Sequence, residues 1–394
     1  MNNADPSRSA LPVALALALA SAVSLGLARF SYALILPAMR ADLGWSFFTS
    51  GAMNTGNAAG YLVGALLAPR WLATFGARAV LLAGGLGATL MLAAHGLVLG
   101  DAALMSLRFA VGVASAASFV GGGLLAARLA GGALSAGLVL GIYYGGTGLG
   151  IVASAWLVPP LAERMAPHAW QAAWLALAAV ALLATAITAR ATRHLAAPSA
   201  QAATRAPFRW APMRYALAGY LMFGLGYIGY MTFVITLLRQ QGLSAAQTVG
   251  FFTMLGTGVV ASSWLWAGLL QRCRGGQALA LLNGLLAIAT LLPVLSANPV
   301  VVFISGGLFG AVFLSVVAST TALVRHNLPS AAWPSGIAAF TIVFAAGQIV
   351  GPSVVGWVAD GPAGLAGGFA ASAAVLALGA ALAWLHKPLA PLDV

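Results

Sequence analysis

The feature that most constrains this chain is the recurrence of long apolar runs from one end to the other. Hydrophobic residues make up 61% of the 394 positions, enough for about twelve membrane-spanning helices of about 20 residues each. Short polar, Gly- or Pro-bearing turns separate the runs. The expected spans are 11–38, 46–69, 78–99, 102–127, 135–158, 169–190, 213–238, 246–270, 277–296, 299–323, 334–358 and 365–386. We therefore predict an all-α membrane protein with twelve transmembrane helices.

Scarce charge excludes the other broad classes of protein. Charged residues make up 6% of the chain, against about 25% in a soluble globular protein. This rules out a water-soluble enzyme, a disordered chain and a secreted disulfide scaffold. The single cysteine, Cys273, excludes an intramolecular disulfide. No group of residues has metal-ligand spacing, so we expect no metal or cofactor.

The positive charges are concentrated in alternate loops. Three basic residues fall in one set of loops: Arg40, Arg164 and Arg239. Thirteen fall in the other set: Arg8, Arg70, Arg78, Arg128, Arg190, Arg193, Arg205, Arg209, Arg214, Arg272, Arg274, Arg325 and Lys387. The positive-inside rule then places both termini in the cytoplasm. The net charge of +12 reflects topology, and we expect no binding of nucleic acid.

The two halves of the chain form a repeat. An offset of 198 residues superposes Gly26-Leu27 on Gly224-Leu225, Tyr32 on Tyr230, and Gly112 on Gly310. We predict an N-terminal six-helix bundle at 1–190, a cytoplasmic linker at 191–212 and a C-terminal six-helix bundle at 213–394. Two pseudo-symmetric bundles are typical of a transporter whose binding site lies between its repeats.

Three motifs make the chain resemble the major facilitator superfamily. Leu104-x3-Arg108-x3-Gly112 is similar to its fourth-helix motif. Gly137-x3-Gly141-x3-Gly145-Gly146-x-Gly148-x-Gly150 is similar to its fifth-helix glycine motif, although the usual Pro is absent. The loop at 69–78 occupies the place of the gating loop, where Gly76 and Arg78 fit but Ala73 replaces the expected Asp. Its counterpart at 268–272 has Gln271 at the matching position, so both halves depart from the family's cytoplasmic lock.

Two stretches, 29–45 and 141–146, resemble a YbfB/YjiJ-type bacterial branch of predicted efflux permeases. The resemblance covers nearly the whole chain. It implies the major facilitator fold, transport by alternating access and a multi-pass location in the bacterial inner membrane. It carries little information about the substrate.

Two arginines fall within predicted spans. Arg29 and Arg108 lie about 9–14 Å below the predicted outer surface, at 1.5 Å per residue, and the resemblance places both spans beside the central cavity. A buried arginine is costly, by about 3 kcal/mol on insertion scales, and no acid lies well within a span. Arg recognises planar anions through its forked donors. We predict that both bind an anionic substrate; the alternative is structural bonding to backbone carbonyls.

The other candidate substrate ligands are aromatic or carry amides. The repeat pairs Arg29 with Tyr227, on an aromatic face of its span, and Tyr combines packing with a hydroxyl. Helix–helix packing is the competing interpretation for every member of this set: Tyr32, Tyr227, Tyr230, Tyr143, Tyr144, Asn54, Asn57 and Gln348.

Gating and coupling have their own candidates. Gly76, Arg78, Gly145, Gly146 and Arg272 are the expected gating residues. Three titratable residues expected near the outer rim are the candidates for coupling to protons: Asp42, His95 and Asp360. An inside-negative potential favours export of an anion by about 2.3 kcal/mol per charge per 100 mV, but the direction of transport stays open.

These observations favour a secondary active transporter of a small, carboxylate-like organic anion, either proton-coupled or driven by exchange. The runner-up is proton-coupled efflux of a neutral or hydrophobic compound. A membrane enzyme or sensor is a distant alternative, because no catalytic constellation is apparent and we expect no enzymatic activity. The expected partners are the substrate and membrane lipid, with the chain acting as a monomer.

Overall fold

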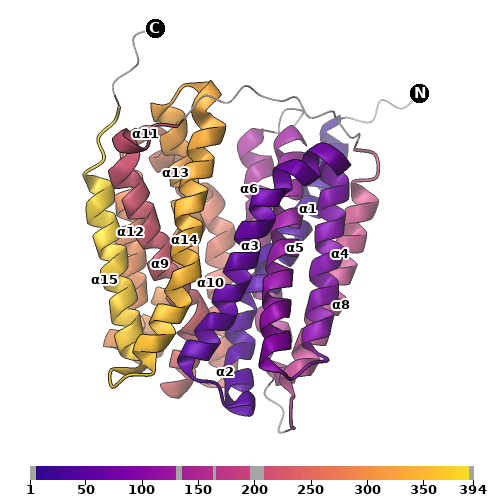
Figure 1. Ribbon diagram of the computed structural model, residues 1–394, viewed down its shortest axis with the longest axis vertical. Helices are drawn as coiled ribbons and strands as arrows, with labels where there is room; N and C mark the ends of the chain where they lie inside the picture. Colours follow the sequence, from indigo (N-terminus) through magenta and orange to yellow (C-terminus); the bar gives the residue numbers. More distant parts are fainter. Residues whose placement is uncertain (1–5, 130–134, 163–165, 196–207, 390–394) are drawn as a thin grey trace. The chain divides into compact units, whose positions relative to one another are not determined.

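The computed structural model describes residues 6–129, 135–162, 166–195 and 208–389 (Figure 1). These residues form helices and connecting turns, with no β-strand among them. The first half contains α1 (Pro6–Ser21), the π-helix η1 (Ala22–Phe30), α2 (Tyr32–Leu43), α3 (Phe47–Phe75), α4 (Ala77–His95), α5 (Asp101–Leu129), α6 (Ala136–Leu157), α7 (Pro159–Ala162) and α8 (Trp170–Ala191). The second contains α9 (Trp210–Gln240), α10 (Ala245–Leu265), α11 (Ala267–Arg272), α12 (Gln277–Leu295), α13 (Pro299–Asn327), the 3-10 helix η2 (Ser330–Ala332), α14 (Trp333–Ala359) and α15 (Gly364–Trp384).

The predicted all-α membrane fold is confirmed. Among the described residues, eleven segments are long and apolar enough to cross a membrane. The predicted second span, α3, is also long, at 29 residues, but its first half carries several polar side chains. Arg164 and Arg205, which entered the count of basic residues in the loops, lie outside the described residues.

The sequence repeat reappears in the helix boundaries. α3 begins at Phe47 and α10 at Ala245, and α5 begins at Asp101 and α13 at Pro299. Both pairs are separated by 198 residues (245 − 47 and 299 − 101), which is the offset found in the sequence. Corresponding helices therefore follow one another in the same order in the two halves.

The chain divides into two compact units. Unit 1 comprises residues 1–45, 56–200 and 244–264, and unit 2 comprises 46–55, 201–243 and 265–394. The units thus differ from the sequence halves in two places. The first turns of α3 pack with unit 2, and nearly all of α10 packs with unit 1.

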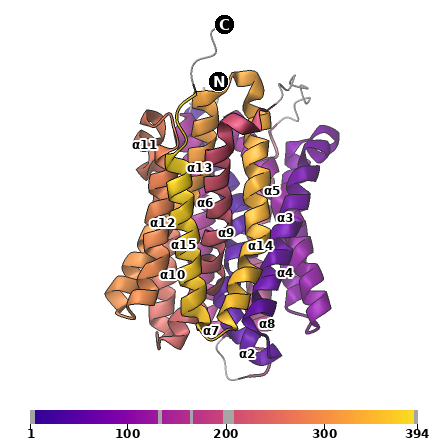
Figure 2. The same cartoon turned by 60° about the vertical axis from the view of Figure 1, so that its left-hand side comes forward.

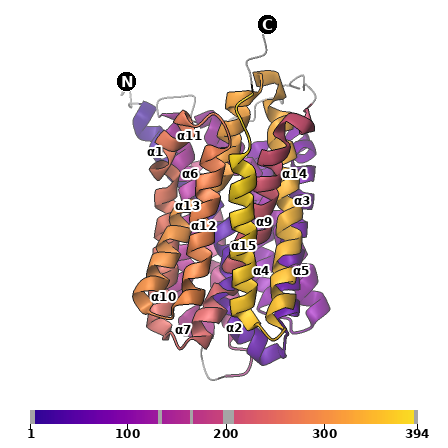
Figure 3. The same cartoon turned by 90° about the vertical axis from the view of Figure 1, so that its left-hand side faces the viewer.

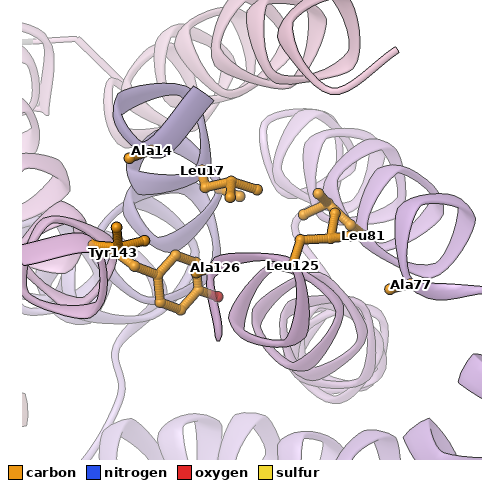
Figure 4. Close-up of a cluster of buried hydrophobic side chains, with 9 residues drawn as sticks. Ala14, Leu17, Ala77, Leu81, Leu125, Ala126 and Tyr143 are labelled. Atoms are coloured by element: carbon orange, nitrogen blue, oxygen red, sulfur yellow. The ribbon is translucent and has the colours of Figure 1, made fainter. Parts of the chain in front are cut away.

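Within unit 1, α4 packs along α5 and α8 (Figure 1). α1 and η1 pack along α6. The buried cluster of Figure 4 joins four of these helices through Leu17, Leu81, Leu125 and the ring of Tyr143. α10 is held to α6 at glycines: a Cβ at Gly148 would overlap the carbonyl oxygen of Gly256 on α10.

Within unit 2, α15 lies between α12 and α9, as Figure 3 shows. α9 also packs along α14, and Figure 2 shows these two neighbours from another side. α9 is buried along most of its length, so it forms the centre of this unit.

Glycines allow α3 to approach α5 closely within unit 1. A Cβ at Gly60 would overlap the carbonyl oxygen of Phe109, and one at Gly64 would lie 2.6 Å from the carbonyl oxygen of Val113. Small residues are the usual means by which membrane helices come into close contact. Because the contact atoms belong to the backbone, side-chain rotation cannot relieve such an overlap.

We predict that Gly60→Ala lowers the unfolding temperature of the protein in detergent. Overpacking costs about 1–3 kcal/mol and exceeds the gain of about 1 kcal/mol from replacing a helical glycine with alanine. Gly137→Ala is the matched control, because Gly137 is also helical and a Cβ there would meet nothing within 4 Å. Equal unfolding temperatures for the two variants would contradict the proposed packing constraint.

Candidate functional site

A π-helix interrupts the first span in unit 1. η1 runs for nine buried residues from Ala22 to Phe30, and the amide of Ser31 donates to the carbonyl of Gly26, five residues earlier, at 3.0 Å. Gly26 packs directly on Gly150 of α6, where a Cβ would lie 2.5 Å from the Gly150 Cα. Such wide turns are rare and occur often at functional sites. Arg29 lies in the last turn of η1.

Arg108 on α5 is buried beside η1, with a side chain 1% exposed. Its Nη1 donates to the carbonyl of Ala28 at 3.3 Å, and its Cζ lies 4.4 Å from the centroid of the Tyr32 ring. The glycine of the Arg-x3-Gly motif allows α3 to approach, since a Cβ at Gly112 would overlap the carbonyl oxygen of Asn57. Asn57 then donates to the backbone carbonyl of Arg108 at 3.2 Å.

Arg29 is also buried, with a side chain 4% exposed. Its Cζ lies 5.6 Å from the ring centroid of Tyr61 on α3 and 5.8 Å from that of Phe30. Arg29 and Arg108 lie on two elements that pack against each other, η1 and α5. Sequence reasoning missed Tyr61 and Phe30. Phe30 follows Arg29 directly, whereas the only signal for Tyr61 was its position after Gly60 in the glycine-spaced part of α3.

Together these residues form a cationic, aromatic-lined site in unit 1, which we call the arginine site: Arg29, Arg108, Phe30, Tyr32, Tyr61 and Asn57. Aromatic faces stabilise guanidinium groups through cation–π attraction within about 6 Å. The N–H edge of a guanidinium is the part that binds carboxylate or phosphate. The site therefore has the chemistry for an anionic group attached to a flat or apolar body.

Two coupling candidates, Asp42 and His95, form internal contacts in unit 1. Asp42 Oδ2 accepts from Trp170 Nε1 at 2.6 Å and lies 2.6 Å from His168 Nδ1. His95 is fully buried, its Nδ1 lies 2.6 Å from the carbonyl oxygen of Met91, and its ring packs against Trp174 at 4.7 Å. These contacts give Asp42 and His95 evident structural roles, and their role in coupling stays a prediction.

The third candidate, Asp360, lies at the end of α14 in unit 2. Its carboxylate accepts hydrogen bonds from the backbone amides of Phe47 and Phe48, both at 2.8 Å. Asn54, also in the first turns of α3, donates to Thr232 Oγ1 on α9 at 2.7 Å. Asn54 and Asn57 are three residues apart, yet they bond to different units.

The candidate tyrosines of α9 lie in a buried aromatic stack. Tyr227 packs in near-parallel orientation between Phe223, at 4.7 Å, and Phe313, at 6.0 Å. Tyr230 lies 4.0 Å from Phe309 in centroid distance, and its hydroxyl is 2.7 Å from Ser305 Oγ. Gln348 is buried on α14. The structure thus places these three candidates in unit 2, where Tyr227 and Tyr230 have clear packing partners.

Tyr143 and Tyr144 on α6 face different surroundings. The Tyr143 hydroxyl donates to the carbonyl of Phe119 at 2.5 Å, and the side chain is fully buried. Tyr144 is 42% exposed, and its ring lies 5.9 Å from that of Phe119. Both tyrosines therefore have packing partners on α5, and a direct role in binding substrate stays a prediction for each.

The gating candidates lie mainly at helix ends and close crossings. Gly76 precedes α4 with φ of 77°, a left-handed conformation that favours glycine. Arg78 donates to the carbonyls of Thr192 and Ala189 at the end of α8, where a cation complements the helix dipole. Gly146 meets the Ala18 carbonyl of α1 so closely that a Cβ would overlap it, whereas Gly145 has a looser contact with α10. Arg272 is exposed at the end of α11.

Comparison with known proteins decides the family. The family model described as "Uncharacterised MFS-type transporter YbfB" matches residues 21–384. The chain belongs to this family of major facilitator superfamily transporters. Its members are not enzymes. None of the curated proteins compared with this transporter matches it.

Solved structures show the same fold at low sequence identity. A bacterial homologue of the human lysosomal transporter Spinster, in an inward-facing and unoccupied conformation, aligns with a TM-score of 0.71 at 14% identity, covering 97% of each chain. The nucleoside transporter NupG aligns with a TM-score of 0.70 at 15% identity, covering 95% of this transporter and 100% of NupG. A point mutant of NupG aligns with a TM-score of 0.73 at 15% identity, covering 94% and 98%.

We predict that the Tyr32 ring stabilises the transporter by covering the face of Arg108. Tyr32→Leu should lower the free energy of unfolding by about 1–2 kcal/mol through the lost cation–π contact. Tyr32→Phe retains a ring and should lose less. Thermal unfolding of the two purified variants in the same detergent checks this order, and an equal loss in both would contradict it.

Proposed function

We propose that this transporter moves a small organic anion with a carboxylate-like group across the inner membrane of a bacterium. The observation that carries the proposal is the arginine site, in which two buried guanidiniums lie on aromatic rings in adjacent elements of one unit. A family of transporters implies a small-molecule substrate, and the chemistry of this site supports an anionic one.

The charge balance of the spans supports the same proposal. Two buried positive charges on packed elements repel each other in a medium of low dielectric constant. The chain has six acids, and those within the described residues, Asp42, Asp101 and Asp360, lie at the ends of helices. A substrate anion would lower the electrostatic energy of the pair when bound, which couples substrate binding to the arrangement of η1 and α5.

The charge of the proposed substrate also bears on the mode of transport. We propose alternating access, with the anion moving either together with a proton or in exchange for another anion. Export of an anion is favoured by an inside-negative potential, by about 2.3 kcal/mol per charge per 100 mV. Uptake would need a compensating proton or exchange partner. We further propose that the transporter acts as a monomer in contact with membrane lipid, with both termini in the cytoplasm.

One alternative has its own support in unit 2. The aromatic stack that contains Phe223, Tyr227 and Phe344 offers parallel rings, which suit a neutral, flat compound. In that case the arginines would serve coupling, and Tyr227 and Tyr230 would contact the substrate. Ligands without charge would then stabilise the protein, and anions would have no effect.

We predict that Arg29→Ala strongly weakens the binding of organic anions. In wild type, a panel of aliphatic and aromatic carboxylates, sulfonates and phosphates should include ligands that raise the unfolding temperature. Loss of a charge-assisted hydrogen bond costs about 1.5–3 kcal/mol, so affinity should fall at least about tenfold. Arg29→Lys retains the charge without the planar fork and should bind with intermediate affinity.

Arg325→Ala is the matched control for this experiment. Arg325 also lies over an aromatic ring, 5.3 Å from the centroid of Trp333, but at the exposed end of α13. It should leave the response to anions unchanged. If no anion stabilises wild type, or if Arg29→Ala binds anions as wild type does, the proposed substrate class is wrong.

A further inference from the structure

The first turns of α3 form a regular seam with the end of α14 inside unit 2. A Cβ at Gly51 would overlap the carbonyl oxygen of Pro352, and one at Gly356 would overlap that of Phe47. Thr55 Oγ1 donates to the carbonyl of Ile349 at 2.6 Å and lies 2.9 Å from Ser353 Oγ. These contacts recur about once per turn on both helices, which run antiparallel along a seam of about 12 Å.

Asp360 closes this seam by capping α3. An α-helix leaves its first amides without partners inside the helix. Here the amide of Thr49 donates to Ser46 Oγ at 3.0 Å, and that of Ser50 donates to the carbonyl of Ser46 at 3.1 Å. The two amides before them donate to the two carboxylate oxygens of Asp360, both at 2.8 Å. The cap of α3 is therefore completed by a residue 312 positions away.

The Asp360 carboxylate lies between the C-terminus of α14 and the N-terminus of α3, whose helix dipoles act on its charge in opposite directions. Asp360 is the C-cap residue of α14, and a negative charge at the C-terminus of a helix is opposed by the dipole of that helix. The N-terminus of α3 carries the opposite partial charge and attracts the carboxylate. Asp360 is thus disfavoured by its own helix and stabilised by α3, so its charge contributes to the seam more than to α14.

The rest of α3 belongs to unit 1. From Gly56 onward the helix belongs to unit 1, where Gly60 and Gly64 hold it against α5. α3 is a single uninterrupted helix from Phe47 to Phe75. Any movement of unit 1 against unit 2 must therefore bend α3 near residues 55–56 or separate its first turns from α14.

We propose that Asp360 is a positioning residue for the transport cycle: its carboxylate latches the first turns of α3 to α14, and release of the latch lets α3 move as one helix with unit 1. This inference rests on the membership of the chain in a transporter family and is independent of the substrate. The two helices separate at the seam because the hydrogen bonds across it involve the Thr55 hydroxyl and the Asp360 carboxylate, whereas bending α3 near residues 55–56 would break backbone hydrogen bonds of a continuous helix.

Cysteine labelling measures the opening of the seam without a substrate. The single native cysteine is replaced (Cys273→Ser), and Ser353→Cys places a probe in the seam. Intact cells are labelled with a membrane-impermeant maleimide. Asn at position 360 has one acceptor oxygen and no charge, so Asp360→Asn should raise the labelling rate of the probe about fivefold to tenfold. Asp360→Glu, which retains the charge, should restore most of the slow labelling.

Two controls separate a latch from a general loss of structure. Asp101→Asn removes another acid at a helix end, whose carboxylate accepts from Trp45 Nε1 within unit 1 at 2.8 Å, and it should leave the labelling rate unchanged. Val358→Cys probes the same last turn of α14 on the side facing Gly367 of α15. If Asp360→Asn accelerates both cysteine probes equally, α14 unfolds locally and the proposal is overturned. It is also overturned if Asp360→Asn leaves the Ser353→Cys probe at its original rate.

A disulfide provides the complementary measurement. With Cys273 replaced, Thr55→Cys and Ser353→Cys bring two thiols together across the seam, and mild oxidation should join them rapidly while the latch is closed. Asp360→Asn should slow this cross-linking several-fold, since the seam then spends more time open. An unchanged rate of cross-linking contradicts the latch. Because no ligand is involved, this result stands or falls separately from the proposed transport of anions.

Discussion

Direct contact between helix backbones at glycine is the constraint on which the rest of this structure depends. In a bilayer, helices gain little from hiding apolar side chains from one another, so their association relies on close packing and hydrogen bonds. Here α3 contacts α5 closely at Gly60 and Gly64, and η1 contacts α6 at Gly26 and Gly150. α6 contacts α10 in the same way at Gly148. The close contact of α3 with α5 brings Asn57 to the backbone of Arg108 and the Tyr61 ring to Arg29.

The three acids within the described residues each join two helices or a helix and a neighbouring loop at a helix end. Asp42 joins the end of α2 to Trp170, Asp101 accepts from the indole of Trp45, and Asp360 caps α3. Each carboxylate accepts from a donor distant in sequence. Positive charge, in contrast, enters the interior of unit 1 on η1 and α5. Within the described residues, the acids therefore lie at helix ends, whereas Arg29 and Arg108 are buried within unit 1.

The sequence predicts the framework well because the signals for it are local. Apolar runs mark the spans, and the offset of 198 residues reappears at α3 and α10. It singles out Arg29 and Arg108, since a charge within a span is conspicuous, and the structure places both side chains in buried positions of unit 1. It does not predict the partners of Asp360 or Arg78, because these are backbone amides and carbonyls that every residue has. Nor does it predict η1, the π-helix that packs on α6 where Gly26 meets Gly150.

Because α3 contributes to both units, cutting the chain between its two halves would disrupt packing in each unit. A cut between residues 196 and 207 would produce one fragment that retains α3 and another that retains α9 and α14. The first turns of α3, including Asn54, would then be separated from Thr232 and Asp360, their partners in unit 2. α10 would be separated in the same way from α6. Each fragment would lack part of its own packing, so the two halves are interdependent in folding even though the sequence repeats.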